Sequence, residues 1–176
     1  MNTEVILVDT DDRQLGTMEK MEVHRKGLLH RAFSVFIFNS KGELLMQQRA
    51  NEKYHSAGLW TNTCCSHPLP DEHTDKAAER RLKEEMGMNC ELKKAFQFIY
   101  NIELENNLIE HELDHVYIGY ADSQPKPDPI EVQDWKYINM EKLATELHSN
   151  PQNYTVWLRH CFEKVYAYHN TNKKKD

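Results

Sequence analysis

The chain has 176 residues and a formal net charge of −6 at pH 7. This length fits one domain with its own apolar core, so we expect a single domain over residues 1–176 that ends in a disordered tail from about residue 170. Nucleic-acid phosphates are held by a surplus of Lys and Arg, so the acidic balance argues against a general nucleic-acid binder. The apolar run near the N-terminus has only four residues, and we therefore expect neither a signal peptide nor a membrane span.

The four cysteines are Cys64, Cys65, Cys90 and Cys161. Two of them are adjacent in the sequence, and this spacing does not suit a small disulfide-rich secreted fold. A reducing, cytoplasmic setting is the simplest expectation. We expect Cys64 to be structural, and Cys90 and Cys161 to be small buried apolar side chains.

The first half of the chain favours strands. Glu4 to Val8 is apolar enough to form a first strand, and Ala32 to Phe38 is rich in aromatic and β-branched residues. Turn residues fill Asn39 to Gly42. The following segment, Glu43 to Gln48, is expected to pair back on Ala32 to Phe38 as a hairpin.

The second half mixes helices and strands. From Thr74 to Met86 apolar residues recur at helical spacing, and Gly87 is placed to end that helix. We expect strands near Phe96 to Ile102, Asp114 to Tyr120 and Trp135 to Ile138, and further helices at Met140 to His148 and Tyr154 to Tyr168. The mixture predicts an α/β fold in which mixed β-sheet layers are covered by helices.

The stretch from Trp60 to Met88 is the most informative part of the sequence. It places a thiol, Cys65, and an imidazole, His67, just before a helix that carries several carboxylates, and such groups bind metals and move protons. Aligned from Ser66, the stretch has the spacing of the Nudix box, Gx5Ex7REUxEExGU, which is filled by Glu72, Arg80, Leu82, Glu84, Glu85, Gly87 and Met88. Ser66 replaces the usual glycine, and Arg81 replaces the first glutamate. These departures argue against simple diphosphate hydrolysis.

On this helix Arg81 and Glu85 share one face, and Arg80 and Glu84 share the adjacent face. For an isolated helix, the expected interpretation is two surface ion pairs worth roughly 0.3–0.5 kcal/mol each. The preceding cysteine and histidine favour a functional interpretation instead. An arginine can bind a phosphate oxygen while the neighbouring glutamate reaches it through a divalent cation.

A second group of interest is Glu110-His111-Glu112. In an extended segment the two carboxylates project to one face and His111 to the other. Two carboxylates so close repel unless a cation neutralises them, which indicates a metal. The alternative is an exposed strand edge that is acidic to discourage aggregation.

Histidines supply the remaining candidate ligands. His24 and His30 are six residues apart, roughly 20 Å in a straight strand, so shared ligation requires a bend, for which Lys26-Gly27 is suited. Either histidine alone fits a solvated loop. Together with His67, Glu110 and Glu112 they form a His3Glu2 set, which suits a manganese-like or zinc-like ion with five or six ligands. The other histidines, among them His55 and His115, have no ligand-like spacing and are expected to be ordinary surface or core residues.

Six motifs in this order resemble the type I isopentenyl-diphosphate isomerases, a group with a Nudix-like fold, over Glu4 to about Cys161. The motifs are Leu29-His30-Arg31-Ala32-Phe33-Ser34, Gly58-Leu59-Trp60-Thr61-Asn62, Cys65-Ser66-His67-Pro68, Arg80-Arg81-Leu82, Glu85-Met86-Gly87 and Glu110-His111-Glu112. In that family the arginine at the Nudix glutamate position is usual, and serine for glycine occurs. The resemblance implies an isomerase of isoprenoid biosynthesis that interconverts isopentenyl and dimethylallyl diphosphate, acting on a small-molecule substrate.

The resemblance also implies a role for each matching residue. Cys65 and Glu112 would be the acid and base groups on opposite faces of the substrate. The divalent ion, Mn2+ or Zn2+, would be held by His24, His30, His67, Glu110 and Glu112, and Glu85 would bind a Mg2+ that arrives with the diphosphate. Lys20, Arg49, Lys53 and Arg81 would hold the phosphates, and Tyr100 and Trp157 would line the hydrocarbon end of the pocket. From the sequence alone, Trp157 also fits an ordinary helix core.

Two other functions remain as alternatives. A Nudix hydrolase of nucleoside or prenyl diphosphates is disfavoured by Arg81, since the glutamate normally found there helps to hold a catalytic metal. A non-catalytic diphosphate-binding domain is disfavoured by the retained thiol and acidic pair.

Overall fold

The computed structural model describes residues 3–173. Its strands are β1 (Glu4–Val8), β2 (Gln14–Glu19), β3 (His30–Phe38), β4 (Leu44–Arg49), β5 (Trp60–Thr61), β6 (Cys64–Ser66), β7 (Leu92–Glu103), β8 (Ile109–Tyr120) and β9 (Val132–Ile138). The helices are α1 (Lys20–Lys26), α2 (Thr74–Met86), α3 (Met140–Ser149) and α4 (Val156–Lys173), with short 3-10 turns η1 (Glu105–Asn107) and η2 (Pro151–Asn153). Within the described residues no helix is long and apolar enough to cross a membrane.

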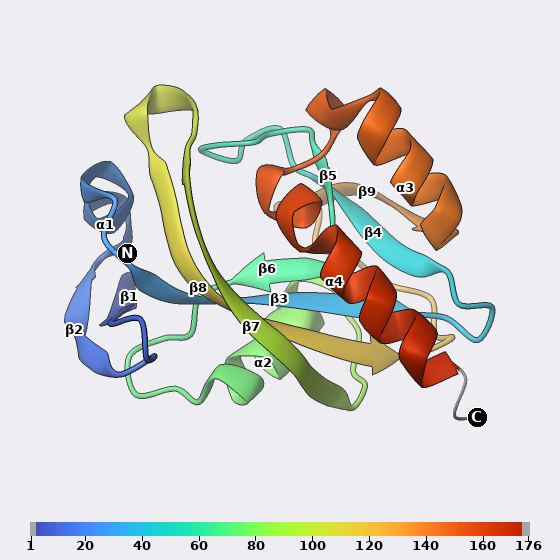
Figure 1. Cartoon of the computed structure of the whole chain (residues 1–176), viewed down its shortest axis with the longest axis horizontal. Coiled ribbons are helices and arrows are strands. Elements are labelled where there is room, and N and C mark those ends of the chain that lie inside the picture. The colour runs from blue at the N-terminus through green and yellow to red at the C-terminus, as the bar shows by residue number, and fades with distance from the viewer. Residues whose placement is uncertain (1–2, 174–176) are drawn as a thin grey trace.

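Strand β3 is the centre of one mixed, branched sheet (Figure 1). One side of β3 pairs in parallel with β8 over its whole length, from His30 opposite Glu112 to Phe38 opposite Tyr120. The other side pairs antiparallel in turn with β1, β6 and β4. Strand β7 extends the sheet beyond β8, and β9 pairs with β4.

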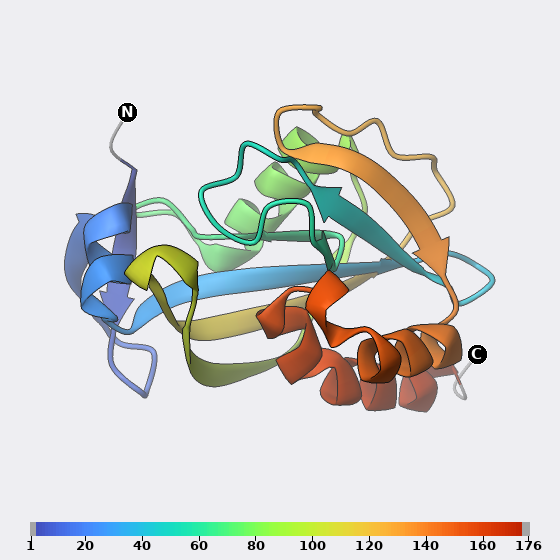
Figure 2. The ribbon, with the colours of Figure 1, turned by 90° about the horizontal axis from the view of Figure 1, so that it is seen from above.

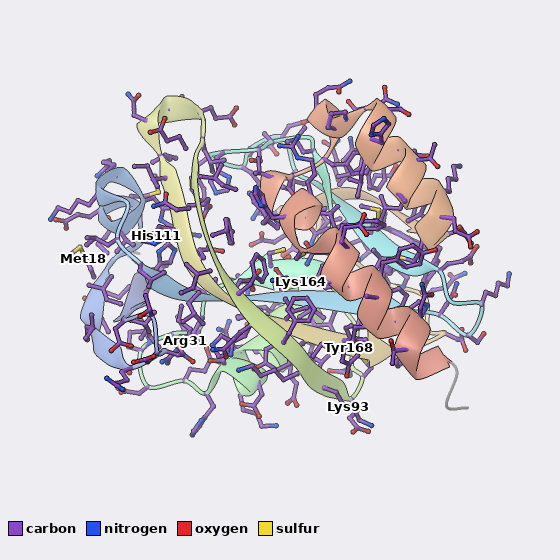
Figure 3. The ribbon with its side chains drawn as sticks, in the orientation of Figure 1. Met18, Arg31, Lys93, His111, Lys164 and Tyr168 are labelled. Atoms are coloured by element: carbon purple, nitrogen blue, oxygen red, sulfur yellow. The ribbon has the colours of Figure 1, made fainter. Side chains whose placement is uncertain are left out.

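Helices cover both faces of this sheet, as Figure 2 shows, with α2 on one side and α3 and α4 on the other. Alternate β3 side chains point to opposite faces. Phe36 and Phe38 belong to the core cluster under α3 and α4, whereas Val35 and Ile37 belong to the cluster under α2. Lys164 of α4 lies over the edge of the first cluster, with Nζ 5.4 Å from the centre of the Phe98 ring (Figure 3).

Most of the expected elements are present, and the expected α/β fold with a mixed sheet is confirmed. Strand β1 and helix α2 have the predicted bounds, and Gly87 ends α2 in the left-handed region at φ 63°. The predicted hairpin is reduced to two residue pairs at its turn, because β4 pairs mainly with β9. A disordered tail was expected from about residue 170, but helix α4 continues to Lys173. Residues 174–176 lie outside the described residues.

Two elements near the N-terminus were not expected. Strand β2 pairs with β1, and α1 follows it directly. The Glu19 carboxylate caps α1 by accepting from the backbone N–H groups of Met21 and Glu22. Gly27 then ends the helix at φ 62°, a conformation that glycine adopts without strain, and the chain turns into β3.

Candidate active site

The turn at Gly27 brings together the first two histidines of the predicted metal set. His24 projects from α1 and His30 opens β3, and their ring centres are 4.9 Å apart. The expected bend between them is therefore present, in the form of a helix end. His67 follows β6, which pairs with the middle of β3, and its ring centre is 5.0 Å from that of His30.

The carboxylates of the set come from β8. Glu110 and Glu112 alternate with His111, whose Nδ1 lies 2.9 Å from the Gly27 carbonyl oxygen on the side of α1 (Figure 3). The parallel register places Glu112 directly opposite His30. Glu110 is 3% and Glu112 7% exposed, so the alternative of an exposed acidic edge is wrong.

One ligand atom from each of His24, His30, His67, Glu110 and Glu112 lies within 4.8 Å of the others. Donors about 2.0–2.2 Å from one ion lie up to roughly 4.4 Å apart, so small side-chain shifts bring the set to ligating distances. Two of the atoms, His24 Nε2 and Glu110 Oε2, are buried without a hydrogen-bond partner in the described structure. The site therefore fits a divalent metal ion.

Backbone contacts prepare two of the histidines for ligation. His24 Nδ1 lies 2.6 Å from the Lys20 carbonyl oxygen, and His30 Nδ1 lies 2.9 Å from that of Leu28. Because a carbonyl only accepts, each Nδ1 carries the proton and each Nε2 is left with a lone pair that faces the cluster. Such outer contacts are usual for metal-binding histidines.

Burial raises the pKa of Glu112, as does the charge of Glu110, but the neighbouring His30 and His67 outweigh both and lower it overall. The two oxygens of Glu112 face different partners. Oε1 is 2.8 Å from His67 Nε2, on the metal side, whereas Oε2 accepts from the Tyr100 hydroxyl at 2.5 Å. Burial also keeps Tyr100 protonated by raising its pKa well above the usual value.

The thiol of Cys65 has several polar neighbours. It donates to Asn62 Oδ1 at 2.9 Å and accepts from the Trp157 indole N–H at 3.2 Å, and the Ser34 hydroxyl lies 3.7 Å away. Burial and the nearby charge of Asp114 raise the pKa of Cys65 to about 12. The thiol is thus protonated at neutral pH, and tuning of its pKa by neighbouring cations, which we expected, is not found.

A pocket enclosing about 660 Å³ of empty space, its open mouth included, joins these groups. It is lined by both predicted acid–base residues and by all of the predicted substrate-binding residues, Lys20, Arg49, Lys53, Arg81, Tyr100 and Trp157. Glu85, Glu110 and His67 line it as well, whereas His24 and His30 are fully buried behind its wall. The pocket thus has cations, aromatic rings and the acid–base pair on one continuous surface.

The α2 charges form a network rather than two surface pairs. Glu72 receives two hydrogen bonds from Arg80, at 2.7 and 2.8 Å. Arg81 Nη2 binds Glu85 at 2.6 Å and also Glu131 at 3.2 Å. Glu85 is held on its other oxygen by the Gln47 amide at 2.9 Å and is only 4% exposed.

Three residues of this site were missed in the sequence. His55, expected to be ordinary, lies with Nε2 3.1 Å from Glu110 Oε1. Glu131 joins Lys53 to Arg81 by ion pairs with both. Asp114 is buried against the Ser34 hydroxyl at 2.8 Å, and burial raises its pKa well above the usual value. Each contact spans 50 residues or more of chain and leaves no local spacing signal.

The other cysteines are only partly as expected. Cys161 is a buried core residue. Cys64 is fully buried under α2, where burial and the charge of Glu85 raise its pKa well above the usual value. Cys90, expected to be buried, is only partly covered at the edge of that cluster.

Fold and site together define a NUDIX-type domain with a histidine–carboxylate cluster that fits a divalent metal ion, and a NUDIX domain model matches residues 28–160. Solved structures agree on the fold. A Deinococcus radiodurans protein superposes with a TM-score of 0.79 at 17% identity, covering 93% of this chain and 99% of its own. The MutT protein of Methanosarcina mazei has a TM-score of 0.66 at 24% identity, with 82% and 96% covered.

Sequence relatives are closer. "Isopentenyl-diphosphate Delta-isomerase 2" of Aromatoleum aromaticum is 48% identical over 98% of this chain and 91% of its own length. A second isomerase of that organism is 52% identical, with 95% and 94% covered, and the isomerase of Pectobacterium atrosepticum is 51% identical, with 94% and 93% covered. The chain therefore belongs to the isopentenyl-diphosphate Delta-isomerase family.

Proposed function

We propose that this chain interconverts isopentenyl diphosphate and dimethylallyl diphosphate in isoprenoid biosynthesis. Family membership supports the reaction, and one observation carries its assignment to this pocket: the Cys65 thiol, whose pKa burial raises, and the Glu112 carboxylate, whose pKa neighbouring histidines lower, line the same cavity. The reaction adds a proton to the terminal carbon of one double bond and removes another from the carbon two bonds away. It needs a donor and an acceptor but no oxidant.

Cys65 and Glu112 are the proposed proton-transfer pair. The buried, protonated thiol has a proton to give, and the lowered pKa of Glu112 leaves a carboxylate that can take one. Tyr100 holds Oε2 of Glu112 through its hydroxyl and thereby orients the carboxylate. In the reverse direction the same two groups exchange roles, because the forward step leaves a thiolate and a carboxylic acid.

Between the two proton transfers the hydrocarbon carries a positive charge on a tertiary carbon. Trp157 is 4% exposed, lines the pocket and donates its indole N–H to Cys65, so its ring lies beside the place where such a cation would form. An indole face stabilises a desolvated cation by about 2 kcal/mol and is no nucleophile that would trap it. The buried wall also limits the access of water, which would quench the cation.

Lys20, Arg49, Lys53 and Arg81 are the proposed diphosphate ligands. All four line the pocket, on the same continuous surface as Glu85. Burial lowers the pKa of Lys20 although the charge of Glu110 opposes this, so an arriving diphosphate would favour its charged form. Glu85 is the proposed ligand of a Mg2+ that enters with the diphosphate.

His24, His30, His67, Glu110 and Glu112 are the proposed ligands of a Mn2+ or Zn2+ ion. When bound, such an ion neutralises the paired carboxylates and acts as a Lewis acid beside them. We further propose that the protein acts in the cytoplasm.

The test is incubation of the protein with isopentenyl diphosphate and Mg2+ in D2O, followed by NMR. We expect dimethylallyl diphosphate that carries deuterium, because the added proton comes from groups in exchange with solvent. Release of inorganic phosphate or diphosphate without isomer would instead identify a hydrolase. If no product forms with Mg2+, Mn2+ or Zn2+, the catalytic proposal is wrong.

A further inference from the structure

A fourth histidine, His55, approaches the metal site from the loop between β4 and β5. Its side chain is 4% exposed, and its Nε2 lies 3.1 Å from Glu110 Oε1. Its Nδ1 lies 3.3 Å from the Ser56 hydroxyl, which can donate to it. Since an ionised carboxylate only accepts, His55 can hold Glu110 Oε1 when its ring proton stands on Nε2.

His55 divides the roles of the two Glu110 oxygens. Oε1 faces His55, whereas Oε2 lies 3.4 Å from His24 Nε2 and has no hydrogen-bond partner among the described residues. A carboxylate fixed by one oxygen cannot rotate freely about its last bond. The oxygen that remains is therefore kept towards the donor cluster.

His55 itself stands outside that cluster. The group of five donors within 4.8 Å of one another does not include it. Its ring centre is 6.4 Å from that of His24, compared with 4.9 Å for His30 and 5.7 Å for His67. By these distances the His55 ring lies further from His24 than the rings of the other two proposed histidine ligands.

We propose that His55 is a positioning residue of the metal site, which holds Glu110 by Oε1 so that Oε2 faces the ion. The inference rests on the metal-binding part of the proposed function and not on the isomerase reaction. The same residue also packs against the rest of the pocket. Arg49 donates to the His55 carbonyl oxygen at 3.1 Å, and the Trp157 ring meets the imidazole edge-on at 5.8 Å.

The test measures Mn2+ and Zn2+ affinity of the full-length protein by competition with a chelator, so that it does not depend on activity. His55→Leu removes the donor at similar size and should weaken binding about 10- to 100-fold, the usual effect of losing an outer-shell partner. In His55→Asn the side chain is too short to reach Glu110, so metal binding should weaken as much as in His55→Leu. His55→Gln keeps a donor of sufficient length and should stay within about threefold of wild type.

His115→Leu is the matched control. His115 is also a buried histidine with Nε2 close to a carboxylate, 2.9 Å from Asp12, but it does not line the pocket. This variant should lower the melting temperature without changing metal affinity. Circular dichroism of the metal-free proteins establishes which variants are folded, and His55→Asn replaces His55→Leu if the latter is not.

Two results would overturn the inference. Wild-type metal affinity in folded His55→Leu or His55→Asn would show that Glu110 needs no such partner. An equal loss in His55→Gln and His55→Leu, together with an altered visible spectrum of the Co2+ form, would make His55 a direct ligand. Intact metal affinity with no isomerase activity in the wild type would refute the proposed function and leave this inference standing.

Discussion

At the scale of single residues, Cys65 and Glu112 share a pocket but have opposite environments. Cys65 contacts the neutral groups of Asn62 and Trp157, and burial, followed by the charge of Asp114, raises its pKa. Glu112 has two histidines beside it, which overcome the effect of burial. Two groups that differ in this way are suited to give and to take a proton without an external base.

Cys65→Ala should abolish turnover while leaving metal content intact, because the thiol lies outside the group of five metal donors. Loss of a general acid or base costs about 10²- to 10⁴-fold in rate. His67→Ala, which removes one of the five proposed metal donors, should lower both metal content and turnover. NMR turnover and elemental analysis measure the two quantities, and a Cys65→Ala protein as active as wild type would refute the thiol's role.

Glu131 is the residue that joins the two cations Lys53 and Arg81 at the pocket. In Glu131→Gln these cations lose their shared carboxylate, so KM for isopentenyl diphosphate should rise about tenfold, the value of one charge-assisted hydrogen bond, with kcat little changed. Glu84→Gln is the control, because Glu84 also pairs with Arg81 but has Arg80, not Lys53, as its other partner. A lower KM in Glu131→Gln would mean that this carboxylate competes with the diphosphate.

At the scale of elements, the predictable parts are those with strong local signals. Helix α2 has Ala77, Ala78, Leu82 and Met86 on its buried face and a terminal glycine, and its bounds follow from that pattern. Helix α1 has seven residues and a glutamate as its cap, so neither length nor cap residue marks it in the sequence. The contacts of His55 and Glu131 depend on how loops meet across the sheet, which no local pattern encodes.

Gly87 couples α2 to the loop before β9. Its φ is +63°, and an added Cβ would stand 2.5 Å from the Lys126 carbonyl oxygen, so Gly87→Ala should lower the free energy of unfolding by about 1–3 kcal/mol. Gly16→Ala is the control, since an added Cβ there meets nothing within 4 Å, and should change stability by less than about 0.5 kcal/mol. Chemical denaturation measures both, and equal stabilities of the two variants would contradict the argument.

At the scale of the whole molecule, buried histidines make stability depend on pH. Burial, together with the charge of Lys94, lowers the pKa of His115 from 6.5 to about 4, although Asp12 opposes this. The unfolded chain therefore binds the proton first, and the His115 contribution is present above pH 6.5 and lost as pH falls towards 4. The free energies of unfolding of wild type and His115→Gln, taken from denaturation curves across this pH range, should converge at the acid end. A difference that stays constant with pH would contradict this contribution of His115.

The parallel pairing of β3 with β8 has a consequence for the rates of folding and unfolding. It places His30 beside Glu112, two residues that are far apart along the chain, and closing so long a loop is slow. We expect this closure to limit the rate of folding, and the five proposed donors come together only with it. Added Mn2+ or Zn2+ should therefore leave the refolding rate unchanged and slow unfolding, as stopped-flow fluorescence can measure. Faster refolding with metal would mean that the donors gather before the two strands pair.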